Sequence, residues 1–211
     1  MAANAQAIRG GQLALSHTAE LAYARPMDNV PEDSALMLRY RDGDVAAFEV
    51  LYRRHKDAVF RYLLRLCQHR DTAEDVFQDV WGKIVKARDN YRPTAKFSTF
   101  LYRVAHNCFI DHIRRNKRHT QTAAVEPDSQ PDPADLPEVE TERSLARRRL
   151  EVALQELPEE QRDVFLLSEE AGLSLDQIAS VTDSNRETAK SRLRYAVNKL
   201  RAAIDEPVRT S

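Results

Sequence analysis

The chain has 211 residues, of which 42% are hydrophobic and 31% charged, as in a soluble protein with one large domain or two small ones. Its 32 Lys and Arg nearly balance its 33 Asp and Glu, so any nucleic-acid surface has to arise from local segregation of charge. No stretch approaches the roughly 20 apolar residues that cross a bilayer. We expect no signal peptide and no membrane insertion, and therefore a cytoplasmic protein. Cys67 and Cys108 give no disulfide framework, in keeping with a reducing compartment.

Helical periodicity begins after a featureless start. Residues 1–32 are rich in Ala without a sustained period, and we expect a flexible extension in which Met27 is a second candidate start codon. From 33 to 119, apolar residues recur at three- and four-residue steps, which predicts several helices around one core. Asp71 and Glu74 have the spacing of an N-terminal capping box and predict a helix start there. With only 5 Gly and few β-branched runs, the sequence predicts an all-α fold.

A composition change divides the chain. Residues 120–140 combine acidic side chains with several Pro and lack Lys and Arg, which predicts a flexible, disordered linker. Helical patterning returns over 141–205, and 206–211 form a short tail. We therefore expect two small helical domains, 33–119 and 141–205, joined by an acidic linker.

The segment 172–194 has the pattern of a helix-turn-helix. Ser174 and Ser184 are placed to cap a short first helix and a longer second helix. Asp183 stands where such turns often have Gly in the left-handed region, which Asp tolerates better than most residues. The second helix is predicted to present polar side chains to the major groove; these are Asn185, Arg186, Glu187, Thr188, Lys190, Ser191, Arg192 and Arg194.

Four stretches together resemble the extracytoplasmic-function (ECF) subfamily of sigma-70 factors, which keep only regions two and four of larger sigma factors. These stretches are 47–55, 73–81, 97–115 and 157–162 with the helix-turn-helix after it. The resemblance covers about 35–203. The chain departs from the family at Glu187 and Ala189, which replace the Gly and Val commonest before Lys-Ser-Arg, and this bears on promoter preference.

The resemblance implies a factor that binds core RNA polymerase and promotes transcription initiation at promoter DNA. Its polymerase contacts would be the beta-prime clamp, through Glu74, Asp75, Gln78, Asp79 and Trp81, and the beta flap. The minus-ten element would be bound by Asn90, Tyr91, Lys96, Asn107, Asp111, Arg114, Arg115, Lys117 and Arg118, and the minus-thirty-five element by the helix-turn-helix. An anti-sigma factor is a further candidate partner. No enzyme activity, cofactor or metal is expected.

Several assignments keep an alternative. Tyr91 is a candidate for stacking on an unpaired base or for packing, whereas Phe97 fits the apolar stripe of its helix. The acids of 74–79 also fit a solvated helix face, and Cys108 with His112 is an isolated i,i+4 pair rather than a metal site. For the whole chain, the alternatives are a stand-alone helix-turn-helix regulator acting without polymerase and a metal-dependent enzyme in the first domain.

Overall fold

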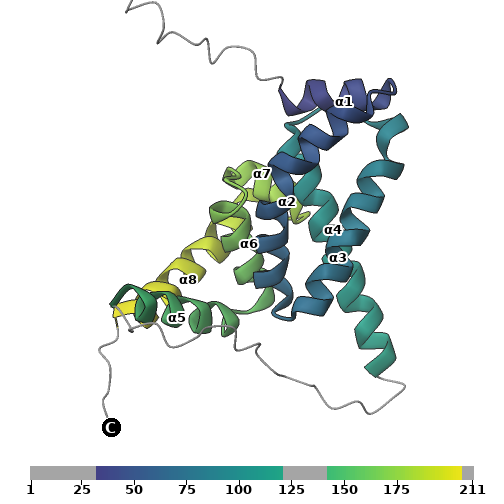
Figure 1. Ribbon diagram of the computed structural model, residues 1–211. Helices are drawn as coiled ribbons and strands as arrows, with labels where there is room; N and C mark the ends of the chain where they lie inside the picture. Colours follow the sequence, from purple (N-terminus) through teal and green to yellow (C-terminus); the bar gives the residue numbers. More distant parts are fainter. Residues whose placement is uncertain (1–31, 121–141, 206–211) are drawn as a thin grey trace, which may run out of the picture. The chain divides into compact units, whose positions relative to one another are not determined.

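The computed structural model describes residues 32–120 and 142–205, and every regular element in them is helical (Figure 1). This confirms the predicted all-α fold. Three predicted segments lie outside the described residues, wholly or apart from one residue. They are the extension 1–32, of which only residue 32 is described, the linker 120–140, of which only residue 120 is described, and the tail 206–211. The helices are α1 (Asp33–Arg41), α2 (Val45–Cys67), α3 (Arg70–Lys86), the 3-10 turn η1 (Arg88–Asn90), α4 (Phe97–Thr120), α5 (Glu142–Gln155), α6 (Glu159–Glu169), α7 (Leu175–Val181) and α8 (Arg186–Asp205).

Helices α2, α3 and α4 pack against one another, and α1 crosses one end of them (Figure 1). The left-handed backbone of Gly43, with φ of 105°, turns the chain between α1 and α2. Asp44 then caps α2, because its carboxylate accepts the Ala47 N–H at 3.2 Å. The inner face of α2 is apolar and fully buried at Leu51 and Val59. The apolar periodicity therefore encodes the face that each helix buries.

Aromatic rings fill the space between α1, α2 and α3. The Trp81 ring meets the rings of Tyr52 and Phe48 edge-on, with centroids 4.8 and 5.9 Å away. Phe48 also stacks on Tyr40 at 4.7 Å. Edge-to-face and offset pairs of this kind add about 0.5–1.5 kcal/mol each beyond the area that they bury. The cluster fixes how α3 is turned about its own axis.

The start of α3 differs from the prediction. The helix begins at Arg70 after His69, which makes no side-chain capping bond, so the expected capping box of Asp71 and Glu74 is wrong. Glu74 instead accepts a hydrogen bond from Arg70 Nε at 2.9 Å. Because the carboxylate is engaged by this i,i+4 side-chain pair, it does not accept a backbone N–H at the start of the helix.

The helix-turn-helix forms as the sequence predicts, with one change of cap. Ser174 and Gln177 make a reciprocal capping box at the start of α7, and Asp183 takes the left-handed conformation with φ of 49°. Ser184 does not cap α8. Asn185 does so, because its side-chain oxygen accepts the Thr188 N–H at 2.7 Å.

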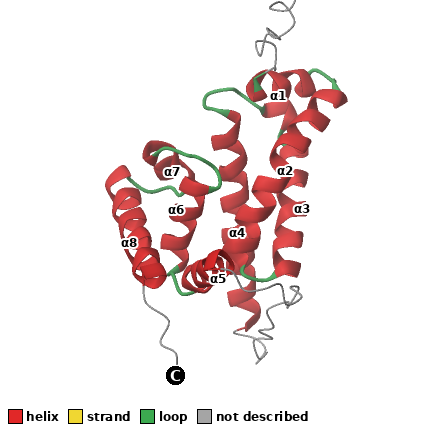
Figure 2. Ribbon diagram, turned by 60° about the vertical axis from the view of Figure 1, so that its left-hand side comes forward, coloured by secondary structure: helices red, strands yellow, loops and turns green. Residues whose placement is uncertain are grey.

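The second group of helices, α5–α8, lies against the first through two contacts. Helix α6 packs on α2, and α7 packs on α4 (Figure 2). One buried apolar cluster runs through both groups and includes Leu63 of α2, Leu101 of α4, Leu167 of α6 and Ile178 of α7. A smaller cluster joins α5 to α8. The described residues of both groups belong to one compact unit, and their division into two domains stays a prediction.

We predict that Ser174→Ala lowers the free energy of unfolding by about 1 kcal/mol, because an amide at the start of α7 loses its acceptor. Urea unfolding followed by circular dichroism measures this. Ser184→Ala is the matched control and should cost less, since Ser184 caps no helix. Equal losses in the two variants would contradict the capping assignment.

Candidate nucleic-acid interface

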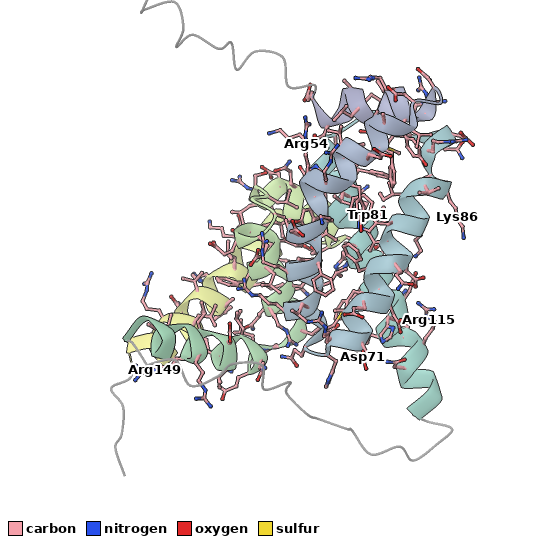
Figure 3. All side chains as sticks on the ribbon, viewed as in Figure 1. Arg54, Asp71, Trp81, Lys86, Arg115 and Arg149 are labelled. Carbon is pink, nitrogen blue, oxygen red and sulfur yellow. The ribbon has the colours of Figure 1, made fainter. Side chains whose placement is uncertain are left out.

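Helix α3 carries exposed polar side chains on one face and the buried Trp81 on another. Glu74, Asp75, Gln78 and Asp79 are all exposed and share one face of the helix. Trp81 lies on the side toward α2 and is only 7% exposed, whereas Lys86 points away (Figure 3). The acids thus form a continuous surface that a partner can reach, which we call the α3 acidic face. Trp81 does not belong to it and instead holds α3 in place from within.

The residues predicted for the minus-ten element fall into two places. Asn90 and Lys96 are exposed around the segment between α3 and α4, and Asn107 and Asp111 are exposed on α4 itself. Arg114 and Arg115 follow, also exposed, on the same helix. The side chains of Lys117 and Arg118 lie outside the described residues.

Ion pairs connect this surface to the α3 acidic face. Lys83 Nζ lies 3.1 Å from the Asp111 carboxylate, and Arg115 Nη2 lies 3.3 Å from that of Asp79. All four side chains are about half exposed. Exposed pairs of this kind contribute at most about 1 kcal/mol, so they can exchange partners at little cost.

Tyr91 is buried rather than displayed. Its side chain is 3% exposed, and its ring packs on Phe100 and Phe97, with centroids 5.2 and 6.4 Å away. A base can stack on this ring only if the segment moves. Phe97 is 2% exposed, which confirms that it belongs to the core.

The eight predicted residues at the start of α8 lie at the surface or are half-buried at Thr188, Ser191 and Arg192. Two of their arginines are held by carboxylates of other helices. Arg192 pairs with Glu160 of α6, and Arg186 pairs with Asp176 of α7 at 3.3 Å. The guanidinium groups are therefore oriented by neighbouring helices before any ligand binds.

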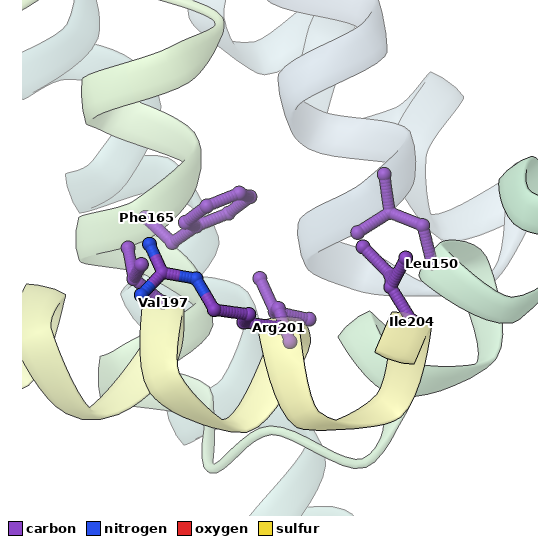
Figure 4. A pocket seen from close by; sticks show the side chains of 6 residues that line it. Leu150, Phe165, Val197, Arg201 and Ile204 are labelled. Atoms are coloured by element: carbon purple, nitrogen blue, oxygen red, sulfur yellow. The ribbon is translucent and has the colours of Figure 1, made fainter. Parts of the chain in front are cut away.

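An apolar hollow of about 320 Å³ opens between α5, α6 and α8 (Figure 4). It is lined by Leu150, Phe165, Val197, Leu200, Arg201 and Ile204. Ile204 is 38% exposed at its edge. The hollow suits an apolar side chain presented by another molecule.

The described residues contain no group of three His, Cys, Asp or Glu side chains that could hold a metal ion. Cys67 and Cys108 form no disulfide, and burial raises the pKa of both thiols, to about 12 for Cys67. Among the described helices, none is long and apolar enough to cross a membrane.

Comparison with known proteins decides between the interpretations that the sequence left open. Residues 51–119 match Sigma-70 region 2, and residues 147–200 match Sigma-70, region 4. The RNA polymerase sigma factor CarQ of Myxococcus xanthus is 31% identical over 81% of this chain and 96% of its own length. The RNA polymerase sigma-H factor of Pseudomonas aeruginosa is 31% identical over 83% of this chain and 93% of its own. The chain belongs to the sigma-70 family, in its ECF group.

Solved structures show the same fold for this sigma factor. The sigma factor RpoE of Bartonella quintana, in complex with the anti-sigma factor NepR, superposes with a TM-score of 0.62 at 22% identity, over 75% of this chain and 98% of that one. CnrH, in complex with the cytosolic domain of CnrY, gives 0.60 at 22% identity over 82% and 97%. At this identity they show the fold alone. Below, region 2 denotes α1–α4 and region 4 denotes α5–α8.

The structure also shows a polar cluster that the sequence did not predict. Asp163 of region 4 is 4% exposed and accepts hydrogen bonds from Tyr62 Oη at 2.7 Å and from His106 Nδ1 at 2.8 Å, both in region 2. Burial, and then the Asp163 charge, raise the pKa of Tyr62 well above its usual value, so this hydroxyl stays a donor. The residues lie 101 and 57 positions apart, and helical periodicity carries no signal across such distances.

Proposed function

We propose that this sigma factor docks core RNA polymerase on the α3 acidic face and carries it to promoters, where region 2 binds the minus-ten element and region 4 the minus-thirty-five element. The observation that carries the proposal is the segregation of exposed charge. Acids occupy one face of α3, whereas Arg114 and Arg115 follow on α4 and four cations lie at the start of α8. A chain with a net charge of -1 thereby offers a surface for a basic protein partner and surfaces for nucleic acid.

Polymerase docking is supported by the geometry of α3. Glu74 with Gln78, and Asp75 with Asp79, are spaced by four residues and therefore lie one turn apart on the same exposed face. We assign this face to the beta-prime clamp. The apolar hollow between α5, α6 and α8 supports a second contact, with an apolar segment of the beta flap.

Minus-ten binding is supported by the side chains at the surface of α4 and the segment before it. Arg114 and Arg115 suit phosphates, which add affinity but no sequence information. Asn90, Lys96 and Asn107 present donors that suit the edges of unpaired bases. Capture of an unstacked base costs a few kcal/mol, and a prebuilt polar surface offsets part of this cost without nucleotide hydrolysis. The sigma factor carries out no reaction itself, since RNA synthesis belongs to the polymerase.

Minus-thirty-five binding is supported by the capped helix-turn-helix. Helix α8 starts with an exposed polar turn, and an arginine oriented by a carboxylate is ready for a bidentate contact with guanine. Glu187, which pairs with Lys190 at 3.8 Å, adds an acceptor for the amino group of cytosine.

Transcription in vitro tests the proposed function against a stand-alone regulator. Purified chain is added to core polymerase on a library of genomic fragments, and RNA 5′ ends are mapped. We expect initiation at a shared two-part promoter only when both proteins are present. Tight, specific duplex binding by the free chain, with no initiation in the presence of core enzyme, would support the regulator instead.

We predict that Asp75→Lys lowers the affinity for core polymerase at least tenfold, because it places a cation in the centre of the α3 acidic face. Binding to immobilised core enzyme measures this. Asp57→Lys on α2 is the matched control, since Asp57 is 74% exposed and lies on another helix. Equal binding by the two variants would remove the docking assignment.

We predict that Arg192→Ala weakens binding of the minus-thirty-five element by the holoenzyme by about 1–3 kcal/mol and relaxes the base preference at one position. Competition between promoter variants measures both quantities. Lys199→Ala, at the far end of α8, is the control and should change neither. A uniform loss over all sequences, with a shallower salt dependence, would make Arg192 a phosphate contact.

A further inference from the structure

Helix α8 carries a single carboxylate among the cations near its start. Glu187 is the second residue of the helix, and α8 contains no other acid before its last residue, Asp205. The Glu187 side chain is 78% exposed, and its Oε2 lies 3.8 Å from Nζ of Lys190, which is 63% exposed. We call these two residues the α8 ion pair. It lies at the end of α8 that, in a helix-turn-helix, enters the major groove and reaches base edges.

The α8 ion pair faces away from the rest of region 4. Ala189, Ala196 and Leu200 are at most 3% exposed and form the inner face of α8. With 3.6 residues per turn, Glu187 stands nearly opposite Ala189 and Ala196 around the helix. Lys190 follows three residues later and is also exposed. A double helix that approaches the outer face of α8 therefore meets this pair directly.

The other polar side chains of the first turn are engaged by the protein. The Asn185 side-chain oxygen accepts the Thr188 N–H at 2.7 Å and thereby caps α8. Arg186 Nε lies 3.3 Å from the Asp176 carboxylate of α7, and Thr188 is half-buried. The α8 ion pair, in contrast, joins two residues of one helix, and exposed pairs of this kind separate at little cost. Both of its side chains are therefore available to a ligand.

The chemistry of a carboxylate restricts the base that it binds. An ionised carboxylate only accepts hydrogen bonds, and the donors in the major groove are the amino groups of cytosine and adenine. In adenine, the acceptor N7 lies beside the amino group and repels a carboxylate, whereas in cytosine a C–H group lies there. Guanine and thymine present acceptors. Glu187 therefore favours cytosine over the other three bases.

The partner of Glu187 suits the partner of cytosine. The Lys190 ammonium only donates hydrogen bonds, and guanine presents two acceptors, O6 and N7, to the major groove. An acceptor beside a donor on α8 thus matches a donor beside two acceptors on a C·G base pair. The lysine also offsets the repulsion between the carboxylate and the DNA phosphates. The two side chains together therefore specify a base pair rather than a single base.

We propose that the α8 ion pair recognises one C·G base pair of the minus-thirty-five element, with Glu187 accepting from cytosine N4 and Lys190 donating to guanine O6 and N7. This proposal rests on the proposed function, because it takes region 4 to bind that element. It predicts that the element contains a C·G pair at the position reached by the first turn of α8.

Selection from a promoter library tests this assignment. The minus-thirty-five region of a promoter found with genomic fragments is randomised, and the duplexes retained by the full chain with core polymerase are sequenced. We expect a C·G preference of about tenfold at one position. Glu187→Gln should move that preference to A·T, because glutamine donates to N7 and accepts from N6 of adenine. Glu187→Ala and Lys190→Ala should weaken the preference at the same position and leave the others unchanged.

A chemically modified base tests the contact atom itself. N4-methylcytosine keeps its pairing hydrogen but carries a methyl group where cytosine presents a hydrogen to the major groove. Placed at the selected position, it should lower binding by the wild type about tenfold and binding by Glu187→Ala by much less. Equal losses in the two proteins would overturn the contact with cytosine N4.

Glu156→Gln is the matched control, because Glu156 is 64% exposed and pairs at 4.0 Å with Lys199, near the other end of α8. It removes one acidic charge from region 4 and should leave the base preference unchanged. The loss of Glu187 also removes a favourable charge from the N-terminus of α8. This structural role alone predicts equal weakening at every position, and that result would overturn the proposal.

Fully randomised duplexes, offered at low salt to the full chain without polymerase, separate this proposal from the proposed function. Selection of C·G by the free chain that depends on Glu187, without initiation by added core enzyme, would refute the proposed function and support recognition by the α8 ion pair. Initiation whose base preference does not change in Glu187→Gln would do the reverse. Absence of any base preference in both measurements would overturn recognition by the α8 ion pair.

Discussion

The buried carboxylate of Asp163 determines how the two halves of this sigma factor meet. Removing a carboxylate from water costs several kcal/mol unless its oxygens are paired. Tyr62 and His106 supply those pairs only when α2 and α4 stand at fixed positions against α6. The surrounding apolar contacts are less demanding, because hydrophobic burial has no direction. The Asp163 carboxylate and its two partners therefore give the contact between regions 2 and 4 a directional specificity that apolar packing alone lacks.

Ion pairs also connect α3 and α4 at the surface, where the charged side chains are exposed. Arg115 is bound to Asp79, and Asp111 to Lys83, so the surfaces that we propose for polymerase and for the minus-ten element share ion pairs across α3 and α4. Under the proposed function, a polymerase cation that takes Asp79 would release Arg115 toward a phosphate. Because exposed pairs are worth at most about 1 kcal/mol, this exchange would cost little and would couple docking to DNA contact. The net charge of the chain does not predict where these charged side chains lie.

The sequence predicted correctly those features that depend on residues close together in the chain. The apolar period identified the helices, and the polar turn with Ser174 and Asp183 identified the helix-turn-helix, because caps and turns depend on neighbours within four residues. The family resemblance placed Trp81 on the polymerase-docking surface, whereas its indole is buried in the core. The sequence did not single out Asp163, because an acidic residue beside Arg162 in a predicted helix is expected to be exposed to solvent. Only the folded structure places Tyr62 next to it. Choosing between the caps Ser184 and Asn185 required the backbone itself.

If α8 reads the minus-thirty-five element as proposed, its ion pairs explain how the free chain avoids binding DNA indiscriminately. In the free chain, Arg192 is bound to Glu160 and Arg186 to Asp176, so a phosphate has to compete with a carboxylate that is already in place. Each exchange is nearly neutral in energy, because one charged partner replaces another. Non-specific affinity, which depends on such phosphate contacts, is thereby reduced. A guanine edge can accept two hydrogen bonds from one guanidinium group. This additional stabilisation remains after the base has displaced the carboxylate. Under this proposal, the acids around α8 lower affinity for DNA in general more than affinity for a matching promoter.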